Sequence, residues 1–580
     1  MTRNRTIWML CAALAMAGVP MSAGAQQMTD AHIRELIKEA NSQAGRPSVV
    51  SDAPQGAAAA TSAVVALTLD DAVKFALERN LDISVQRLNP QISDIAIASA
   101  RSVYHPSLTS TVLQTSTHAT PNSQLQLSSG GGGQNSEALN YNGGLAQALP
   151  WGGGSFQASF NNSRSITNSN NALFNPRFDS TWTAFYVQPL LRNFKIDSAR
   201  QQLQVSKINR DISDVQLRAT ITNTLSNVRN AYWDYVFAIQ AVEVAQRSLD
   251  LASKLVQDNQ TRVEVGTMAP IDVVQAQSEQ ATRRQALVNA ESTRRTAELS
   301  LKRLIVSGTQ DPNWTAELDP IDQPDFRPET IDIESAVRRA LSERTDLEIA
   351  KKNLESNDVS LHFLQDQMKP QADLQVQYGF SGIGGTNYER DPRVLGSPIT
   401  KINPGGIGDA FNTLFRNQYP RWTAQLNIAY PLGLSSQEAS VARARVQLNQ
   451  VQAQLKQIEL QIATDVTNAA IQGRNTSEAV QAARVARELA EKKLEAEQSK
   501  FEVGMSTNYF VVQAQRDLSD ARNSELRAIL NYRKSLVELE RLQQTTLQNL
   551  NITLINAGGG AGVTIRGGGG VGGQGGGGGQ

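Results

Sequence analysis

Side chains that could do chemistry are few in this sequence and lie far apart. Cys11 is the only cysteine, and it lies in an N-terminal segment that we expect to be removed, so the mature chain has no thiol nucleophile and no disulfide. No serine or cysteine nucleophile motif occurs, and no two histidines have the spacing of a metal site. We therefore expect no catalytic residues, no cofactor and no metal site. The four histidines are His32, His105, His118 and His362.

The charged residues indicate solvated helix surface. Lysine plus arginine number 55 and aspartate plus glutamate also number 55, so the formal net charge is zero. A nucleic-acid-binding domain is usually strongly basic, so we expect no nucleic-acid partner. Carboxylates along the helical segments alternate with arginine and lysine at helical spacing, which is typical of a surface in water.

One stretch of the chain occurs twice. Residues 262–277 read RVEVGTMAPIDVVQAQ and residues 500–515 read KFEVGMSTNYFVVQAQ, with eight of sixteen positions identical. Each copy follows a long helical pattern and precedes another, and Gly266 or Gly504 lies at the break. Glycine suits a helix C-terminus that requires a positive φ, and Thr267 can cap the next helix. We interpret each copy as the reversal at the tip of a helical hairpin.

The helical patterns on both sides of these tips are long. No proline or glycine interrupts the chain between Pro189 and Gly266, and apolar residues from Leu448 to Ile462 have the three-four spacing of a coiled coil. The second half repeats the plan of the first, which predicts an internally duplicated fold. The predicted helices cover about 68–103, 189–265, 267–306, 433–503 and 506–550.

Alternating polar and apolar runs precede both long helices, within about 107–189 and 371–431. Alternation with aromatic residues at the ends is typical of strands in a membrane-spanning barrel, although a soluble β-sandwich is the alternative. So few strands cannot close a barrel alone, and unpaired backbone groups are prohibitive in lipid, so several copies must share one. The candidate girdle residues at the membrane boundary are Trp182, Tyr186, Trp422 and Tyr430.

A hairpin around Leu149 to Gly154 gives the first half four predicted strands against two in the second. The turn Pro150-Trp151-Gly152-Gly153-Gly154 suits a tight reversal. Two interpretations of this hairpin stay open at this point. It extends above the membrane, or it adds strands to the barrel.

The start of the chain resembles a secretory signal. Arg3 and Arg5 precede an apolar run from Ile7 to Val19, and Ala23-Gly24-Ala25 fits a cleavage site. The glycine-rich end, from about Ala557, is expected to be disordered. The predicted organisation is a signal peptide (1–25), an N-terminal extension and linker (26–66), a first repeat (67–306), an inter-repeat linker (307–330), a second repeat (331–550) and a glycine-rich tail (551–580).

The chain resembles the TolC family of outer-membrane efflux proteins from about Leu67 to Leu550. The resemblance lies in VEVGTMAPIDVVQAQ, FEVGMSTNYFVVQAQ, VQPLLRNF and AYPLGLSS. It implies a mainly α fold with a transmembrane β-barrel: a homotrimer that shares a twelve-strand barrel in outer-membrane lipid and a periplasmic coiled-coil tunnel of twelve helices. It also implies docking, through a periplasmic adaptor (membrane fusion) protein, onto an inner-membrane pump of RND or ABC type.

The resemblance also assigns residues at the two tips. It implies a periplasmic gate just beyond the glycines, where Asp272 matches an acidic position, Phe510 and Gln513 replace aspartates, and Phe501 replaces a tyrosine. We therefore hypothesise that apolar packing closes this gate, while packing of Phe510 between helices is an equally weighted alternative. The implied adaptor-docking residues are Val265, Gly266, Thr267, Val503, Gly504 and Met505.

The resemblance therefore predicts passive conduction from the periplasm to the exterior, as the exit duct of a tripartite efflux or type I secretion system. The alternative is a periplasmic or surface coiled-coil protein with a structural or adhesive role and no pore. Heat-resistant trimers in outer-membrane fractions would distinguish the two. The cargo, the adaptor and the pump stay open.

Overall fold

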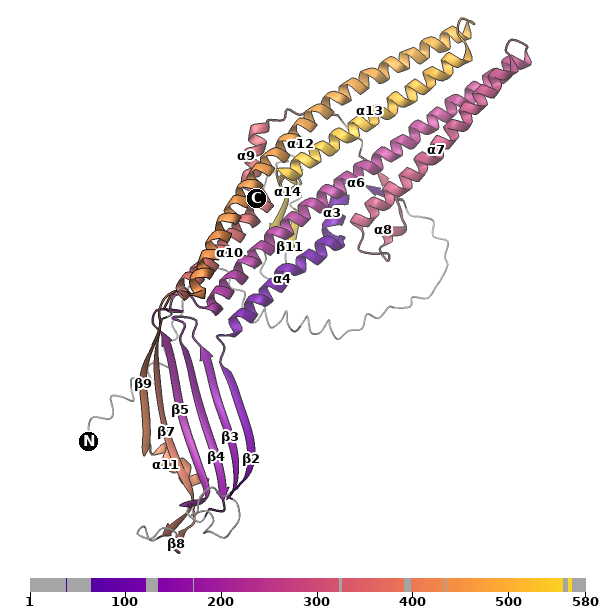
Figure 1. Ribbon diagram of the computed structural model, residues 1–580. Helices are drawn as coiled ribbons and strands as arrows, with labels where there is room; N and C mark the ends of the chain where they lie inside the picture. The colour runs from indigo at the N-terminus through magenta and orange to yellow at the C-terminus, as the bar shows by residue number, and fades with distance from the viewer. Residues whose placement is uncertain are drawn as a thin grey trace, which may run out of the picture. The chain divides into compact units, whose positions relative to one another are not determined.

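A computed structural model describes most of the chain (Figure 1). The described residues are 38, 64–120, 134–169, 172–322, 326–390, 398–430, 432–433, 435–555 and 562–565. Ala59–Leu550 forms one compact unit, and the chain ends form another. Within the latter, β10 (Ile552–Ile555) pairs antiparallel with β11 (Gly562–Ile565). The predicted signal peptide, nearly all of the extension and most of the tail lie outside the described residues.

Two long helical hairpins lie side by side in the unit Ala59–Leu550 (Figure 1). α6 (Ser198–Glu264) returns as α7 (Pro270–Ile305), and α12 (Ser436–Glu502) returns as α13 (Asn508–Leu542), with α14 (Thr546–Asn549) following. α6 and α12 each have 67 residues. α6 begins later than the predicted residue 189, because the Asp197 side chain caps its first turn by accepting from the Arg200 N–H at 2.8 Å.

The shorter helices beside them are each broken once, although the sequence predicts one continuous helix over 68–103. α3 (Leu69–Arg79) and α4 (Leu81–Ser102) are separated by Asn80, and α9 (Ile333–Glu343) and α10 (Thr345–Gln367) by Arg344. Asn80 is extended, and its side chain caps α4 and donates to the Leu304 carbonyl at 2.9 Å. The apolar pattern crosses each break because both helices of a pair pack on the same long helix, α6 or α12.

The two predicted linkers contribute a small parallel sheet. β1 (Val64–Leu67) pairs with β6 (Glu317–Pro320), which follows α8 (Pro312–Thr315). The fully buried Tyr235 of α6 donates to the Leu318 carbonyl at 2.6 Å, and Tyr232 donates to the Leu67 carbonyl at 3.1 Å. Burial raises the pKa of Tyr235 to about 12, so its hydroxyl stays a donor. These tyrosines fix the sheet against α6.

An antiparallel sheet lies beyond the helices (Figure 1). Its six long strands, in spatial order, are β2 (Ser107–Ala119), β3 (Gln134–Ala148), β4 (Ser155–Thr167), β5 (Phe174–Pro189), β7 (Gln371–Arg390) and β9 (Tyr419–Ala429). The short β8 (Ile399–Asn403) pairs only with the far end of β7. Four long strands thus come from the first half and two from the second, as predicted.

The turn between β3 and β4 lies at the end of the sheet nearest the helices. Gly152 and Gly153 have positive φ, and the Leu149 N–H donates to the Gly154 carbonyl at 2.8 Å. A Cβ on Gly153 would lie 2.3 Å from the carbonyl oxygen of Asn193, which precedes α6, so a larger residue does not fit. Both strands therefore run the length of the sheet.

The strand register gives the sheet one apolar and one mostly polar face. The apolar face carries Leu108, Val112, Tyr141, Leu145, Phe156, Phe160, Trp182, Tyr186, Val376, Tyr378, Phe380, Trp422, Leu426 and Ile428. The opposite face carries Thr109, Thr111, Asn142, Gln157, Ser159, Asn161, Thr181, Thr183, Gln375, Gln377, Thr423, Gln425 and Asn427, besides the apolar Leu113, Phe185, Val187 and Ile383.

A short helix, α11 (Ile407–Phe415), packs on the apolar face over β5 and β7. Its Ala410 and Leu414 are buried, and the Phe411 ring lies 5.9 Å from the Phe160 ring. A Cβ on Gly382 would lie 1.9 Å from the Ala410 carbonyl oxygen, so glycine is required where the helix rests on β7.

Candidate docking tips and gate

Both predicted tips are sharp reversals with the same backbone geometry. Gly266 has φ of 79° and Gly504 has φ of 77°, the left-handed region in which glycine is favoured. The Thr267 N–H donates to the Arg262 carbonyl at 2.9 Å, and the Met505 N–H donates to the Lys500 carbonyl at 2.8 Å. These bonds close the last turns of α6 and α12. Val265, Val503 and Met505 are 67%, 70% and 80% exposed, so each tip presents apolar side chains to solvent.

Just behind the tips, the two hairpins share one apolar core. All four helices contribute to it, and Phe501 is buried within it at 8% exposure. The Arg262 guanidinium of α6 lies 4.4 Å from the centre of the Phe501 ring, a cation-π geometry. The core consists of Leu255, Val256, Ala276, Leu494, Phe501, Val511, Val512, Ala514 and Leu518.

A pair of buried asparagines also joins the hairpins. The Asn259 amide of α6 donates to the Asn508 side-chain oxygen of α13 at 3.0 Å. Asn508 in turn donates to the backbone carbonyl of Asp272 at 3.2 Å. Because both asparagines are at most 2% exposed, separating the hairpins would leave buried polar groups unpaired.

Two turns farther from the tip, a buried carboxylate lies between two arginines. Glu279 of α7 is 2% exposed, and it accepts from Arg283 Nε at 2.7 Å and from Arg516 Nε of α13 at 3.0 Å. Burial by itself would raise the pKa of Glu279, but the bonds from Arg516 and Arg283 outweigh burial and hold that pKa below its usual value. The ion pair between Glu279 and Arg516 therefore links the two hairpins.

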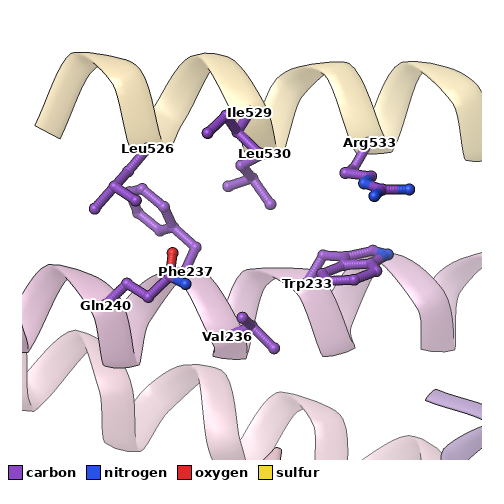
Figure 2. A pocket seen from close by; sticks show the side chains of 8 residues that line it. All are labelled: Trp233, Val236, Phe237, Gln240, Leu526, Ile529, Leu530 and Arg533. Carbon is purple, nitrogen blue, oxygen red and sulfur yellow. The ribbon is translucent and has the colours of Figure 1, made fainter. Parts of the chain in front are cut away.

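The hairpins also meet at mid-length, where Figure 2 shows side chains of α6 facing those of α13. The Arg533 guanidinium lies 5.4 Å from the centre of the Trp233 ring. The cavity between these helices has a volume of about 10 Å³, which holds no more than a water molecule. This region is a packing seam and not a ligand site.

The structure separates the four predicted gate residues. Phe501 is in the core, whereas Phe510 is 53% exposed and its ring makes an edge contact with Tyr509 at 5.5 Å. Phe510 is therefore not packed between the helices of its own chain. Gln513 donates to Asp517 at 2.8 Å, and Asp272 contributes its backbone carbonyl to the asparagine pair.

The residues that join the hairpins were not predicted from the sequence, namely Asn259, Arg262, Glu279, Arg283, Asn508 and Arg516. One signal was present. Glu279 and Asp517 lie 238 positions apart, the same offset as Gly266 and Gly504, so both repeats carry a carboxylate at this place. Asp517 accepts from Lys493 at 2.7 Å within its own hairpin, whereas Glu279 reaches the other hairpin.

One known protein family matches both halves of the chain. The sequence model of the outer membrane efflux protein family matches residues 155–306 and 336–543, which is more than half of the chain. The chain belongs to the outer membrane efflux protein family. The two matches cover both hairpins and the long strands β4, β5, β7 and β9, whereas the long strands β2 and β3 lie outside them. A search of curated proteins finds no match.

Solved structures of outer-membrane proteins have the same fold as this outer membrane efflux protein. The CmeC outer membrane channel of Campylobacter jejuni is 13% identical with a TM-score of 0.58, over 85% of this chain and 86% of that chain. VceC of Vibrio cholerae is 13% identical with a TM-score of 0.57, over 82% and 95%. The open-state MtrE channel of Neisseria gonorrhoeae is 16% identical with a TM-score of 0.56, over 82% and 88%. CmeC and MtrE are outer membrane channels, and VceC is an outer membrane protein.

The predicted girdle residues lie on the sheet of this efflux protein. The Trp182 ring stacks on Phe380 with ring centres 5.0 Å apart, and Tyr186 donates to Gln188 at 2.6 Å. Trp422 is 74% exposed and Tyr430 is 57% exposed. Trp182, Tyr186 and Trp422 share the apolar face, while Tyr430 directly follows β9.

No cluster of three or more His, Cys, Asp or Glu side chains able to hold a metal ion occurs among the described residues. None of the described helices combines the length and apolar character needed to cross a membrane.

Proposed function

We propose that three copies of the chain form an exit duct, in which the sheets close a barrel in the outer membrane and the four long helices of each copy line a periplasmic tunnel. The observation that carries this proposal is the two-faced sheet with two open edges. Among the described strands, β2 pairs only with β3, and β9 pairs only with β7.

Physical chemistry requires both edges to be paired in lipid. An unpaired backbone group in hydrocarbon costs several kcal/mol, so an open sheet cannot remain there. The apolar face suits lipid and the polar face suits a water-filled lumen. The proposed girdle residues Trp182, Tyr186, Trp422 and Tyr430 then lie at the membrane boundaries. Residues 1–25 serve as the signal for export in this proposal.

At the other end, the exposed tips dock onto an adaptor that connects the duct with an inner-membrane pump. The apolar side chains Val265, Val503 and Met505, held by Gly266, Thr267 and Gly504, supply the contact. Conduction through the duct is passive, and the pump supplies the energy. A proton-driven or an ATP-driven pump fits this arrangement equally well.

The experiment that tests the function is purification of the full chain from outer-membrane fractions. We expect a trimer that survives detergent and dissociates only on heating, and that forms ion-conducting channels in planar bilayers. An elongated soluble monomer, without conductance, would refute the duct and support a periplasmic scaffold.

The exposed ring of Phe510 provides a test of the gate. If apolar rings of three copies meet at the tunnel end, Phe510→Ala should raise the open fraction of the channel by about thirtyfold or more, because truncation removes apolar contact worth about 2–3 kcal/mol. Phe415→Ala is the control, since Phe415 is also exposed but lies on α11. An unchanged open fraction in Phe510→Ala would remove Phe510 from the gate.

A further inference from the structure

We propose that β2 and β3 are part of the membrane barrel, so that three copies, with six long strands each, close one barrel of eighteen strands. β2 of each copy pairs with β9 of the next. This inference rests on the proposed function, because it takes the trimer from that proposal. It departs from the twelve strands that the resemblance to the TolC family implies.

The first support is the continuity of the sheet across the hairpin. β2 pairs with β3 without interruption from Ser107↔Ala146 to Ala119↔Gln134, and β3 pairs with β4 from Ser136↔Thr167 to Ala148↔Ser155. The turn between β3 and β4 is at the helical end, where Gly153 lies against Asn193. β2 and β3 therefore cross the same span as the other long strands, and the hairpin does not project from the outer end.

The second support is the side-chain pattern. Leu108 and Val112 of β2, with Tyr141 and Leu145 of β3, extend the apolar face. Leu108 is 83% exposed and Val112 is 72% exposed in the single chain. Thr109, Thr111 and Asn142 extend the opposite face, on which Leu113 is the large apolar side chain of these two strands. The added strands thus have the two-faced pattern that a barrel in lipid requires.

The third support is the direction of the edge strands. In the single chain, β2 runs away from the end of α4, and β9 runs back toward the start of α12 (Figure 1). The two edge strands would therefore be antiparallel to each other when copies are arranged around an axis. A twelve-strand barrel would instead require β4 to pair with β9 of the next copy. β4 already has β3 on one side and β5 on the other, so this arrangement would first break the whole β3–β4 ladder.

The extra strands widen the barrel. With strands about 4.8 Å apart and tilted by about 40°, eighteen strands give a backbone diameter of about 36 Å, against about 24 Å for twelve. The cross-section is thus roughly doubled. A barrel of this width would pass bulkier cargo than a twelve-strand barrel does.

Cysteine cross-linking tests which strand meets β9 of the next copy. Cys11 is the only cysteine and lies in the predicted signal peptide, so native cysteines of the mature chain give no background cross-links. We expect Thr111→Cys combined with Gln425→Cys to give covalent oligomers with a short bis-maleimide in outer membranes, at least tenfold above the control. The control is Asn161→Cys with Gln425→Cys, because Asn161 lies on the same polar face but in β4. Thr109→Cys and Thr115→Cys, each combined with Gln425→Cys, test the other registers in which β2 could pair with β9 of the next copy.

The outcomes separate this inference from the proposed function. Heat-dissociable trimers with cross-links from β2 to β9 support eighteen strands. The same trimers with cross-links from Asn161, or with none from any β2 position, overturn the inference and leave the duct intact. Absence of trimers overturns the proposed function itself.

Discussion

Glu279→Ala is expected to open the closed channel. The substitution leaves Arg283, at 15% side-chain exposure, and Arg516, at 50%, without their shared carboxylate. Removing one partner of a buried ion pair typically costs 3–5 kcal/mol, and the exposure of Arg516 places this site at the lower end, about 3 kcal/mol. We expect opening to separate the two hairpins, so the loss of this contact should weaken the closed arrangement. The measurement is single-channel conductance in planar bilayers, where the open fraction should rise about a hundredfold.

The repeat itself supplies the matched control for this variant. Asp517→Ala removes the equivalent carboxylate, whose partner Lys493 is 56% exposed, so solvent and salt screen this ion pair. We expect Asp517→Ala to conduct like the unchanged protein. If Glu279→Ala and Asp517→Ala behave alike, the ion pair to Arg516 does not hold the hairpins together.

The pKa of Glu279 adds a pH dependence with a defined sign. That pKa is lowered in the folded chain, so the stabilisation is complete above the usual glutamate pKa, about 4.3, and is lost as the pH falls through the lowered value. The unchanged channel should therefore stay closed near neutral pH and begin to open only under acid conditions. Glu279→Ala should lose this part of the acid response.

Valine at the tip glycines is expected to abolish adaptor docking. Gly266 and Gly504 both have φ near +78°, and a β-branched residue there costs at least about 1–2 kcal/mol per site. A Cβ at either position meets nothing within 4 Å, so the effect arises from the backbone and not from a clash. In Gly266→Val with Gly504→Val, amide hydrogen exchange at Thr267 and Met505 should be more than tenfold faster, and in-cell cross-links from the tips to the adaptor should disappear.

Asparagine provides the conservative control for the tips. Asn tolerates the left-handed region better than other non-glycine residues, so Gly266→Asn with Gly504→Asn should retain slow exchange and adaptor cross-links. Trimer yield should be equal in both double variants, because the sheet lies at the other end of the helices. Normal adaptor cross-linking in the valine variant would show that docking does not depend on the tip geometry.

The sequence by itself determined the features that depend on neighbouring residues. The two glycine reversals, the long helices and the duplication follow from local spacing, and the structure confirms them. The alternation of polar and apolar residues likewise predicted the long strands, with four in the first half of the chain and two in the second. These features are local because helix periodicity and a positive φ involve residues only a few positions apart.

The tertiary structure decided which distant groups meet. Asn80 breaks the first helix because its side-chain amide donates to the Leu304 carbonyl. β1 pairs with β6, which follows it by about 250 residues. Glu279 has the periodicity of an ordinary surface carboxylate, and only the packing of α13 on α6 and α7 brings Arg516 to it and excludes water. Phe501 and Phe510 differ in burial although both flank the same glycine. Burial and partner choice depend on the whole packed arrangement, and local spacing does not contain that information.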